Sequence, residues 1–298
     1  MKTTKKTIIA IMAFALATPF LTSCSDDKGC TDPVALNFDK KADKDDGSCI
    51  YATPTPPPPP PSNQSNVVIE FDHKFDGVGV TSANFNTIQY TNAFGNQLSI
   101  SKLRYLISNV KFHRGHPHHD VISTTGYKLI DLTVPGSNIF EIAQSLPKGE
   151  YEGISFTLGF TAVDNITNFY TDLNAATWNW PAMLGGGYHY LQLEGQFINS
   201  SSATVNYAYH HGTAREITAT NDTIFHPNFG VADLSTTAFQ MTASEVEIHL
   251  FVNIDEWFKN PNTWDLNQFS TALMPDFQAQ TMMQQNAATV FELDHVHN

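Results

Sequence analysis

The chain has 298 residues, of which 41% are hydrophobic and 15% are charged, and its 16 basic and 29 acidic residues give a formal net charge of −13. An excess of acidic residues this large excludes nucleic acid and anionic membrane surfaces as the main partners, because both repel a negatively charged protein.

The first 23 residues have the form of a bacterial export signal. Three lysines precede an apolar run over residues 8–21, which has the length of a signal-peptide core and is too short to span a membrane. The run ends in the segment Leu21–Cys24, which resembles the lipobox of bacterial lipoproteins. We therefore predict lipid modification at Cys24, with acyl chains as the membrane anchor and a mature net charge of −16. An ordinary secretory signal is the alternative.

The residues after Cys24 bear on the location of the protein. Asp26 and Asp27 resemble the acidic signals that send some Bacteroidota lipoproteins to the cell surface. We predict an outer-membrane lipoprotein that faces the periplasm or the cell surface.

Residues 24–51 are rich in aspartate and contain the two remaining cysteines. An even count in an oxidising compartment predicts a Cys30–Cys49 disulfide, with two free thiols as the alternative. The segment resembles short Asp-rich repeats related to thrombospondin type 3. Closely spaced carboxylates suit calcium, while a solvated acidic spacer is the alternative. The candidate calcium ligands are Asp32, Asp39, Asp43, Asp45 and Asp46.

A linker and one large domain complete the predicted organisation. Residues 52–66 contain the run Pro56–Pro61 followed by polar residues, which predicts an extended, semi-rigid spacer. Residues 67–298 are long enough for one sizeable β domain.

Within this domain, short runs alternate between apolar and polar residues, as strands with one buried face do. Two clear runs cover residues 153–160 and 245–254, and others begin near residues 69, 98, 127, 189 and 205. Helical spacing is confined to residues 276–290 and to a short turn at 255–259. We predict an all-β fold, an antiparallel β-sandwich or barrel with a short C-terminal helical addition.

Six blocks of the domain form a pattern in their order along the chain: Leu103–Val110, Tyr127–Leu132, Leu146–Tyr151, Phe156–Phe160, Gly187–Gly195 and Tyr209–Gly212. In this order the blocks resemble the MbnP-like family, in its Bacteroidota lipoprotein branch. The family is named for a periplasmic copper protein associated with methanobactin. The resemblance implies a copper site made of two histidines and an oxidised tryptophan, kynurenine, which a partner di-haem enzyme produces.

The aromatic segment Trp178–Met183 corresponds to that part of the family pattern. Trp178 and Trp180 are therefore the candidate modified residues, and a di-haem oxidase or a copper-delivery protein is the implied partner. The sequence departs from the family site in one respect, because no histidine lies within a few residues of either tryptophan.

Histidines on apolar strand faces are the main metal-ligand candidates. His73, His189 and His211 each lie in such a face, and a buried imidazole needs partners for its ring nitrogens. If their strands are neighbours, the three imidazoles could converge on copper, with the adjacent His210 and the thioether of Met183 as further ligands. The alternative is that each histidine packs in the core and bonds to a carbonyl or a tyrosine.

Other histidines rank lower as ligands. His249 falls on the polar face of its strand, and His295 and His297 are expected to fray, with weak metal affinity. A predicted loop carries a second candidate metal cluster, with a variable polar hairpin tip as the alternative. Its histidines are His113, His116, His118 and His119.

The chain lacks the motifs of serine hydrolases, zinc metalloproteases and P-loop nucleotide-binding proteins, so we predict a protein that is not an enzyme. The first hypothesis is an exported lipoprotein that acquires, stores or delivers copper. The second is a cell-surface binding or adhesion module in which the histidines merely pack.

Overall fold

The computed structural model describes residues 27–51 and 63–298, and the chain divides into two units, Met1–Pro58 and Pro59–Asn298. The predicted signal peptide and lipidation site Cys24 lie outside the described residues, as do residues 52–62 of the predicted linker. Over the described ranges, no helix has the length and apolar character that crossing a bilayer requires.

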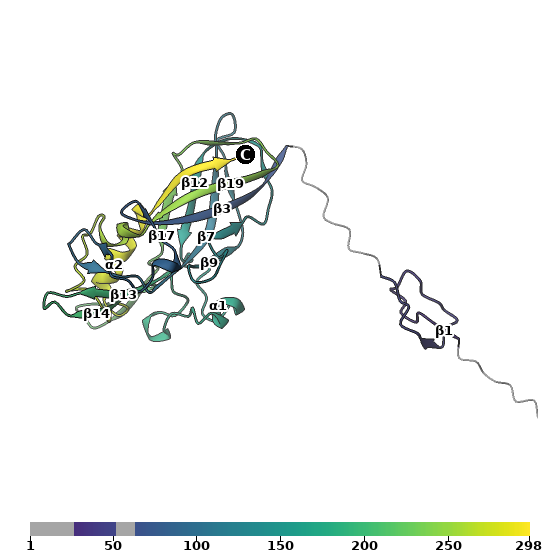
Figure 1. The fold of residues 1–298 in the computed structure, drawn as a ribbon, viewed down its shortest axis with the longest axis horizontal. Coiled ribbons are helices and arrows are strands. Elements are labelled where there is room, and N and C mark those ends of the chain that lie inside the picture. The colour runs from purple at the N-terminus through teal and green to yellow at the C-terminus, as the bar shows by residue number, and fades with distance from the viewer. Residues whose placement is uncertain (1–26, 52–62) are drawn as a thin grey trace, which may run out of the picture. The chain divides into compact units, whose positions relative to one another are not determined.

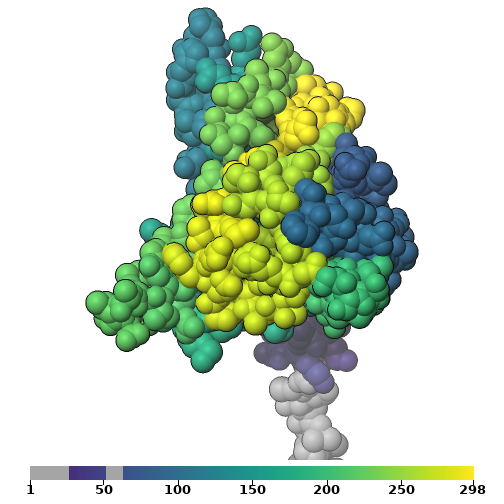
Figure 2. All heavy atoms as spheres, turned by 90° about the vertical axis from the view of Figure 1, so that its left-hand side faces the viewer, coloured from purple at the N-terminus to yellow at the C-terminus, as the bar shows by residue number. Residues whose placement is uncertain are grey.

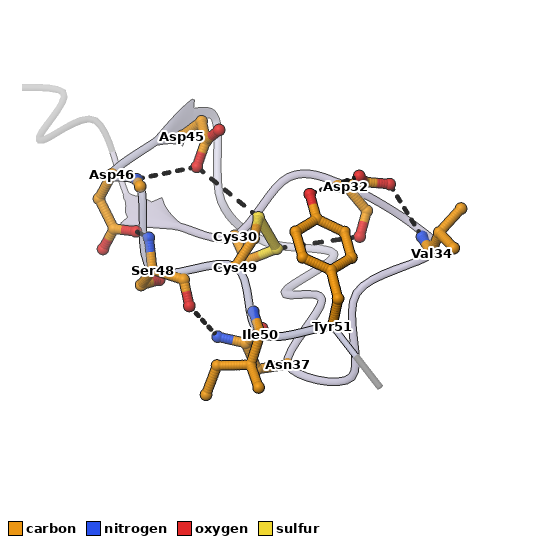
Figure 3. The surroundings of a disulfide bond; sticks show 11 residues. Cys30, Asp32, Val34, Asn37, Asp45, Asp46, Ser48, Cys49, Ile50 and Tyr51 are labelled. Atoms are coloured by element: carbon orange, nitrogen blue, oxygen red, sulfur yellow. Dashed lines mark hydrogen bonds between the residues drawn. A yellow bond between two sulfur atoms is a disulfide. The ribbon is translucent and has the colours of Figure 1, made fainter. Parts of the chain in front are cut away.

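The small unit, described from residue 27 to residue 51, is held by a disulfide. Cys30 and Cys49 are bonded, with their Cα atoms 4.8 Å apart, which confirms the predicted pair (Figure 3). Strands β1 (Lys28–Gly29) and β2 (Lys44–Asp45) pair in parallel. Because so short a segment buries little apolar surface, the covalent link takes the place of a core.

The large unit contains a six-stranded sheet in the order β10-β3-β19-β20, with β4 and β11 also paired to β3. Figure 1 shows β3 and β19 side by side. The buried side chains of β3 and β19 alternate as the sequence pattern predicts. The strand bounds are β3 Gln64–Phe75, β4 Val78–Gly79, β10 Ile139–Glu141, β11 Leu146–Pro147, β19 Glu245–Asn253 and β20 Phe291–His297. Strand β3 thus begins inside the range predicted as linker.

One pair in this sheet differs from the predicted antiparallel arrangement. Strands β3 and β19 run parallel, with Ile69 opposite Ile248. A parallel pair needs a long connection, and here the whole second sheet is formed by the chain between the two strands.

The second sheet has ten strands and antiparallel pairing throughout. Its main order is β17-β12-β7-β13-β6-β5, with β14 on β13, β18 on β12, and β8 and β9 on β7. The bounds are β5 Tyr90–Thr91, β6 Gln97–Leu98, β7 Lys102–Arg114, β8 Val121–Ser123, β9 Tyr127–Asp131, β12 Gly149–Leu158, β13 Leu191–Ile198, β14 Thr204–His211, β17 Gly230–Leu234 and β18 Phe239–Met241.

The core lies between the two sheets. The ring of Phe71 on β3 packs edge-on against Tyr105 of β7 and Phe156 of β12, with centroids 6.2 and 6.0 Å apart. One continuous cluster of buried apolar side chains joins both sheets. The predicted all-β fold class is confirmed.

Helices are short, and those near the C-terminus lie where the sequence predicts them. Helix α2 (Phe277–Asn286) is capped by Asp276, whose side chain accepts a hydrogen bond from the amide of Ala279 at 3.0 Å. A 3₁₀ helix covers Ile254–Phe258, close to the predicted turn at 255–259. In Figure 2, the segment between β19 and β20, drawn in yellow-green and yellow, fills the centre of one face of the domain.

Smaller elements complete the described chain. The sequence did not predict helix α1 or the hairpin of β15 and β16. The bounds are α1 Thr171–Ala175, β15 Ala214–Ile217 and β16 Thr223–His226, with 3₁₀ turns at Ser82–Asn84, Ala182–Leu184 and Ala287–Thr289.

Candidate metal centre

Two histidines and two tryptophans form a cluster at one edge of the ten-stranded sheet. His189 lies two residues before β13, and His210 lies near the end of the paired strand β14. The ring centroid of His189 is 5.3 Å from that of His210, 5.4 Å from Trp178 and 4.9 Å from Trp180. The sequence places these residues in separate blocks, and strand pairing brings them together.

A tight turn explains how the tryptophans reach His189. An antiparallel bridge joins Asn179 to Tyr188, so the chain folds back through a turn that ends in three glycines. Gly187 has φ of 82°, and a Cβ there would collide with the side chain of Asn165. The amide of His189 consequently donates to the carbonyl of Trp178 at 2.9 Å. The missing histidine beside the tryptophans is therefore supplied by the returning chain.

Hydrogen bonds leave one ring nitrogen of each histidine available. The Nδ1 atom of His189 lies 3.1 Å from the carbonyl oxygen of Trp178, which can only accept, so Nδ1 carries the proton and Nε2 carries the lone pair. The Nε2 atom of His210 lies 2.9 Å from Glu194 Oε1, which leaves Nδ1 as its second nitrogen. A carboxylate behind a ligand histidine is the usual support of a metal site.

The local electrostatics favour neutral imidazole at His189. Burial lowers the pKa of His189 to about 4, so the ring is unprotonated at neutral pH. The hydrogen bond from His210 lowers the pKa of Glu194 to about 2, and Lys102, 2.8 Å away, acts in the same direction. A neutral imidazole beside a carboxylate-bonded imidazole is a donor set suited to copper or zinc.

The tryptophans are buried on either side of His189. The indole Nε1 of Trp178 has no hydrogen-bond partner among the described residues, and the guanidinium of Arg104 lies 4.9 Å from its ring centre. The Nε1 atom of Trp180 donates to the carbonyl of Leu184 at 3.1 Å. Trp180 also packs on Gly212, where a Cβ would lie 2.5 Å from the indole ring.

An open groove of about 520 Å³ reaches this cluster at His210. Met183 and Met274 line it, together with Arg215 and Pro275. Met183, a candidate ligand from the sequence, is 75% exposed. Met274 was not predicted, because only the tertiary structure brings it beside His210.

The other two candidate strand histidines do not join this cluster. His73 is buried and its Nε2 lies 2.9 Å from the hydroxyl of Tyr105. His211 is fully buried against Tyr190, with ring centroids 5.4 Å apart, and neither ring nitrogen makes a well-formed hydrogen bond within the described chain. Burial lowers the pKa of both imidazoles to about 3.

The expected convergence of His73, His189 and His211 is therefore corrected. Across residues 27–51 and 63–298, these three do not form a group with ligand atoms close enough for one ion. Neighbouring residues of a strand point to opposite faces, so His210 turns toward His189 while His211 enters the core.

The histidine-rich loop between β7 and β8 is not gathered around one point. His113 Nε2 bonds across to the hydroxyl of Ser155 on β12 at 2.8 Å, and His119 Nδ1 lies 2.6 Å from Glu152 Oε1. The rings of His116 and His119 are 6.1 Å apart, and His118 is exposed. Two of the four imidazoles are thus engaged with β12.

Most of the candidate calcium ligands of the small unit accept hydrogen bonds within their own turns, and Figure 3 shows three of them, Asp32, Asp45 and Asp46. Carboxylate oxygens of four of the five aspartates accept bonds of 2.9–3.0 Å from backbone amides two residues ahead, and Asp32 also accepts one from Tyr51 at 2.8 Å. The four are Asp32, Asp39, Asp45 and Asp46. In the described segment these carboxylates and Asp43 do not come together as a three-ligand group. Calcium binding there stays a prediction.

A different set of histidines does form such a group. His249 of β19 and His295 and His297 of β20 each place a ring nitrogen within 4.8 Å of the others. The prediction that His295 and His297 fray was wrong, because β20 pairs with β19 along its length. The sequence signal was the spacing of two histidines on one strand face, but their partner strand was unknown.

Comparison with known proteins bears on the large unit. No curated protein matches the chain. Among solved structures, MbnP from Methylosinus trichosporium is similar, with a TM-score of 0.47 and 12% sequence identity, over 77% of this chain and 98% of that one. The MbnP family model matches residues 64–282, which include most of both sheets and the histidine–tryptophan cluster. The chain therefore belongs to the MbnP family.

Proposed function

We propose that this protein binds copper at the cluster of His189, His210, Trp178 and Trp180, and that it acquires, stores or delivers the metal without catalytic turnover. The observation that carries the proposal is the His189–His210 pair. Each ring has one nitrogen engaged by an acceptor and the other available, and the ring centroids are 5.3 Å apart. Membership of a family associated with copper supports the same metal.

The surroundings favour Cu(I). His189 Nε2 and His210 Nδ1 would be the imidazole donors, and the thioethers of Met183 and Met274 line the groove on which His210 opens. Imidazole and thioether together select a soft ion such as Cu(I) over the hard cations Mg²⁺ and Ca²⁺. Glu194 would hold His210 in position from behind.

Trp178 and Trp180 are the residues that a partner enzyme would oxidise. Both are buried against His189, and Trp178 has an unpaired indole nitrogen within the described chain. A change in intact mass located at either tryptophan by peptide mapping would support a di-haem oxidase as partner. An unmodified mass after co-expression with such an enzyme would reject this part of the proposal.

The cellular setting belongs to the same proposal. Cys24 would carry the lipid anchor, and an outer-membrane lipoprotein is well placed to capture copper for a delivery partner. Radiolabelled palmitate should be incorporated into the wild-type protein and should be absent from the Cys24→Ala variant.

Cu(I) competition titration tests the metal site. The protein is purified without a histidine tag, and we expect one strong Cu(I) site that is lost in the double variant His189→Gln/His210→Gln. Glu194→Gln should weaken binding by about 10- to 100-fold, the usual effect of removing a carboxylate behind a ligand histidine. Glu216→Gln is the matched control, because Glu216 pairs with His226 at 2.8 Å and neither residue belongs to the cluster. Unchanged affinity in the double variant would reject the site.

A second candidate function is binding of another surface molecule. The loop between β12 and α1 exposes Val163, Ile166 and Phe169, at 81%, 50% and 65%. Exposed apolar side chains grouped in one loop are typical of binding surfaces. A glycan and whole-cell binding screen compares the wild type with the variant Val163→Ser/Ile166→Ser/Phe169→Ser. Binding by the wild type that the variant loses would support adhesion, and an absence of binding by the wild type would reject it.

A further inference from the structure

Three imidazoles lie on one face of the six-stranded sheet, away from the strands that form the copper candidate. In the β19–β20 ladder, His249 is directly opposite His295, and Glu247 is opposite His297. Since residues two apart on a strand share a face, His295 and His297 both turn toward His249. The rings of His249 and His295 are stacked at 4.3 Å, and the ring of His297 stands edge-on to both, at 5.4 and 4.6 Å.

The ring nitrogens are close to the spacing of metal ligands. One nitrogen from each histidine lies within 4.8 Å of the other two, and His295 Nε2 is 2.9 Å from His297 Nε2. Two nitrogens bound to one ion at about 2.1 Å can be at most about 4.2 Å apart. His295 and His297 are exposed, so small rotations of these two side chains would bring their donors and that of the half-buried His249 to one ion.

Carboxylates hold the opposite nitrogens of two rings. His249 Nδ1 lies 3.3 Å from Asp72 Oδ2, and His295 Nδ1 lies 2.8 Å from Asp294 Oδ2. The Nε2 atom of His295 consequently faces that of His297, at 2.9 Å. His249 Nε2 is buried and has no hydrogen-bond partner in the part of the chain described. An orphaned buried nitrogen is costly unless something binds it.

Pairing of the strands alone does not explain this arrangement. Cross-strand neighbours are always close, which accounts for the contact between His249 and His295. It does not account for two ring nitrogens engaged by carboxylates or for a buried ring nitrogen of His249 left without a partner in the described chain. Glu70 and Glu247 add further negative charge, at 3.9 and 3.8 Å from the ring nitrogens of His249.

We propose that His249, His295 and His297 form a second metal site, which binds a divalent transition metal ion of the Zn²⁺ type through three imidazole nitrogens. Three histidines leave the fourth position of a tetrahedral ion open to water or to an outside ligand. The carboxylates of Asp72 and Asp294 beside the imidazoles favour divalent Zn²⁺, Ni²⁺ or Cu²⁺ over Cu(I). This distinguishes it from the groove lined by methionines at His210.

Zn²⁺ titration of the metal-free full chain tests the proposal. Calorimetry should give a Zn²⁺ site that survives in His189→Gln/His210→Gln, and adding His297→Gln to that double variant should weaken it more than about tenfold. Zn²⁺ should also raise the melting temperature of the wild type and leave that of His297→Gln unchanged, because the ion links β19 to β20 only when its ligands are present.

Two controls separate the outcomes. His226→Gln removes a histidine that pairs with Glu216 elsewhere, and it should bind Zn²⁺ as the wild type does. Asp294→Asn retains all three imidazoles and should bind Zn²⁺ about tenfold more weakly, so the test does not depend on how His297→Gln folds. Equal Zn²⁺ affinity in the wild type, His297→Gln and Asp294→Asn would overturn the proposal, as would loss of the site in His189→Gln/His210→Gln alone.

Discussion

Buried histidines in this protein serve different purposes, and their hydrogen bonds distinguish them. His189 donates to a carbonyl beside a second imidazole, whereas His73 bonds to the Tyr105 hydroxyl inside the core. His211 is wholly buried against Tyr190, with no well-formed bond in the described chain and no second imidazole placed beside it there. Burial by itself is therefore a weak guide to a ligand, and the engagement of one ring nitrogen is a better one.

The pH dependence of stability should report on His73. Burial lowers its pKa in the folded state to about 3, while an unfolded histidine titrates near 6.5, so the unfolded state binds the extra proton between these values. The contribution of His73 to the free energy of unfolding is therefore complete above pH 6.5. As the pH falls below 6.5, the free energy of unfolding decreases by up to about 1.4 kcal/mol per pH unit.

Denaturant titrations of the metal-free protein at pH 6.5 and pH 5 measure this effect. The wild type should lose about 2 kcal/mol more than His73→Gln over that interval. Contributions of other histidines cancel in the comparison, and His118→Gln, which removes an exposed imidazole, should behave as the wild type does. Equal losses in the wild type and His73→Gln would contradict the assignment.

At the scale of elements, pairing of β13 with β14 decides which side chains meet. The register sets Gln192 opposite His210 and Leu191 opposite His211, so one histidine faces the cluster and the next enters the core. Gly212 follows β14 and lets the Trp180 indole pack directly on the backbone. The end of one strand thus positions both a ligand and an aromatic wall.

Gly212→Ala should disturb the cluster without altering any ligand. The added Cβ would lie 2.5 Å from the Trp180 ring, so the indole must move, and we expect a loss of about 1–3 kcal/mol in unfolding free energy with weaker Cu(I) binding. Gly79→Ala is the matched control, because its Cβ meets nothing within 4 Å. Denaturation and Cu(I) competition on both variants check this, and identical behaviour of the two would count against the contact.

At the scale of the whole large unit, aromatic packing joins the sheets. Phe71 of the six-stranded sheet contacts Tyr105 and Phe156 of the ten-stranded sheet, and also Phe291 of β20 at 6.4 Å. Strands β3 and β19 pair with each other, and the chain between them forms all strands of the second sheet. We therefore expect the two sheets to unfold together.

Phe71→Ala tests this cooperativity. Removal of the ring should cost about 3–5 kcal/mol and shift near- and far-ultraviolet circular dichroism transitions by the same amount. Phe169→Ala, at a ring that is 65% exposed, should change stability by no more than about 0.5 kcal/mol. Separate transitions for the two signals in Phe71→Ala would show that the sheets unfold independently.

Local patterns in the sequence determined the strand faces and the helix after Asp276, because each depends on residues near one another in the chain. The count of cysteines determined the Cys30–Cys49 pair. Tertiary structure alone decided that His189 meets His210 instead of His211, that β3 and β19 run parallel, and that His295 and His297 meet His249. Alternation tells which face of a strand a residue occupies. Partner and register are set by long-range packing between segments that the chain brings together only when it folds.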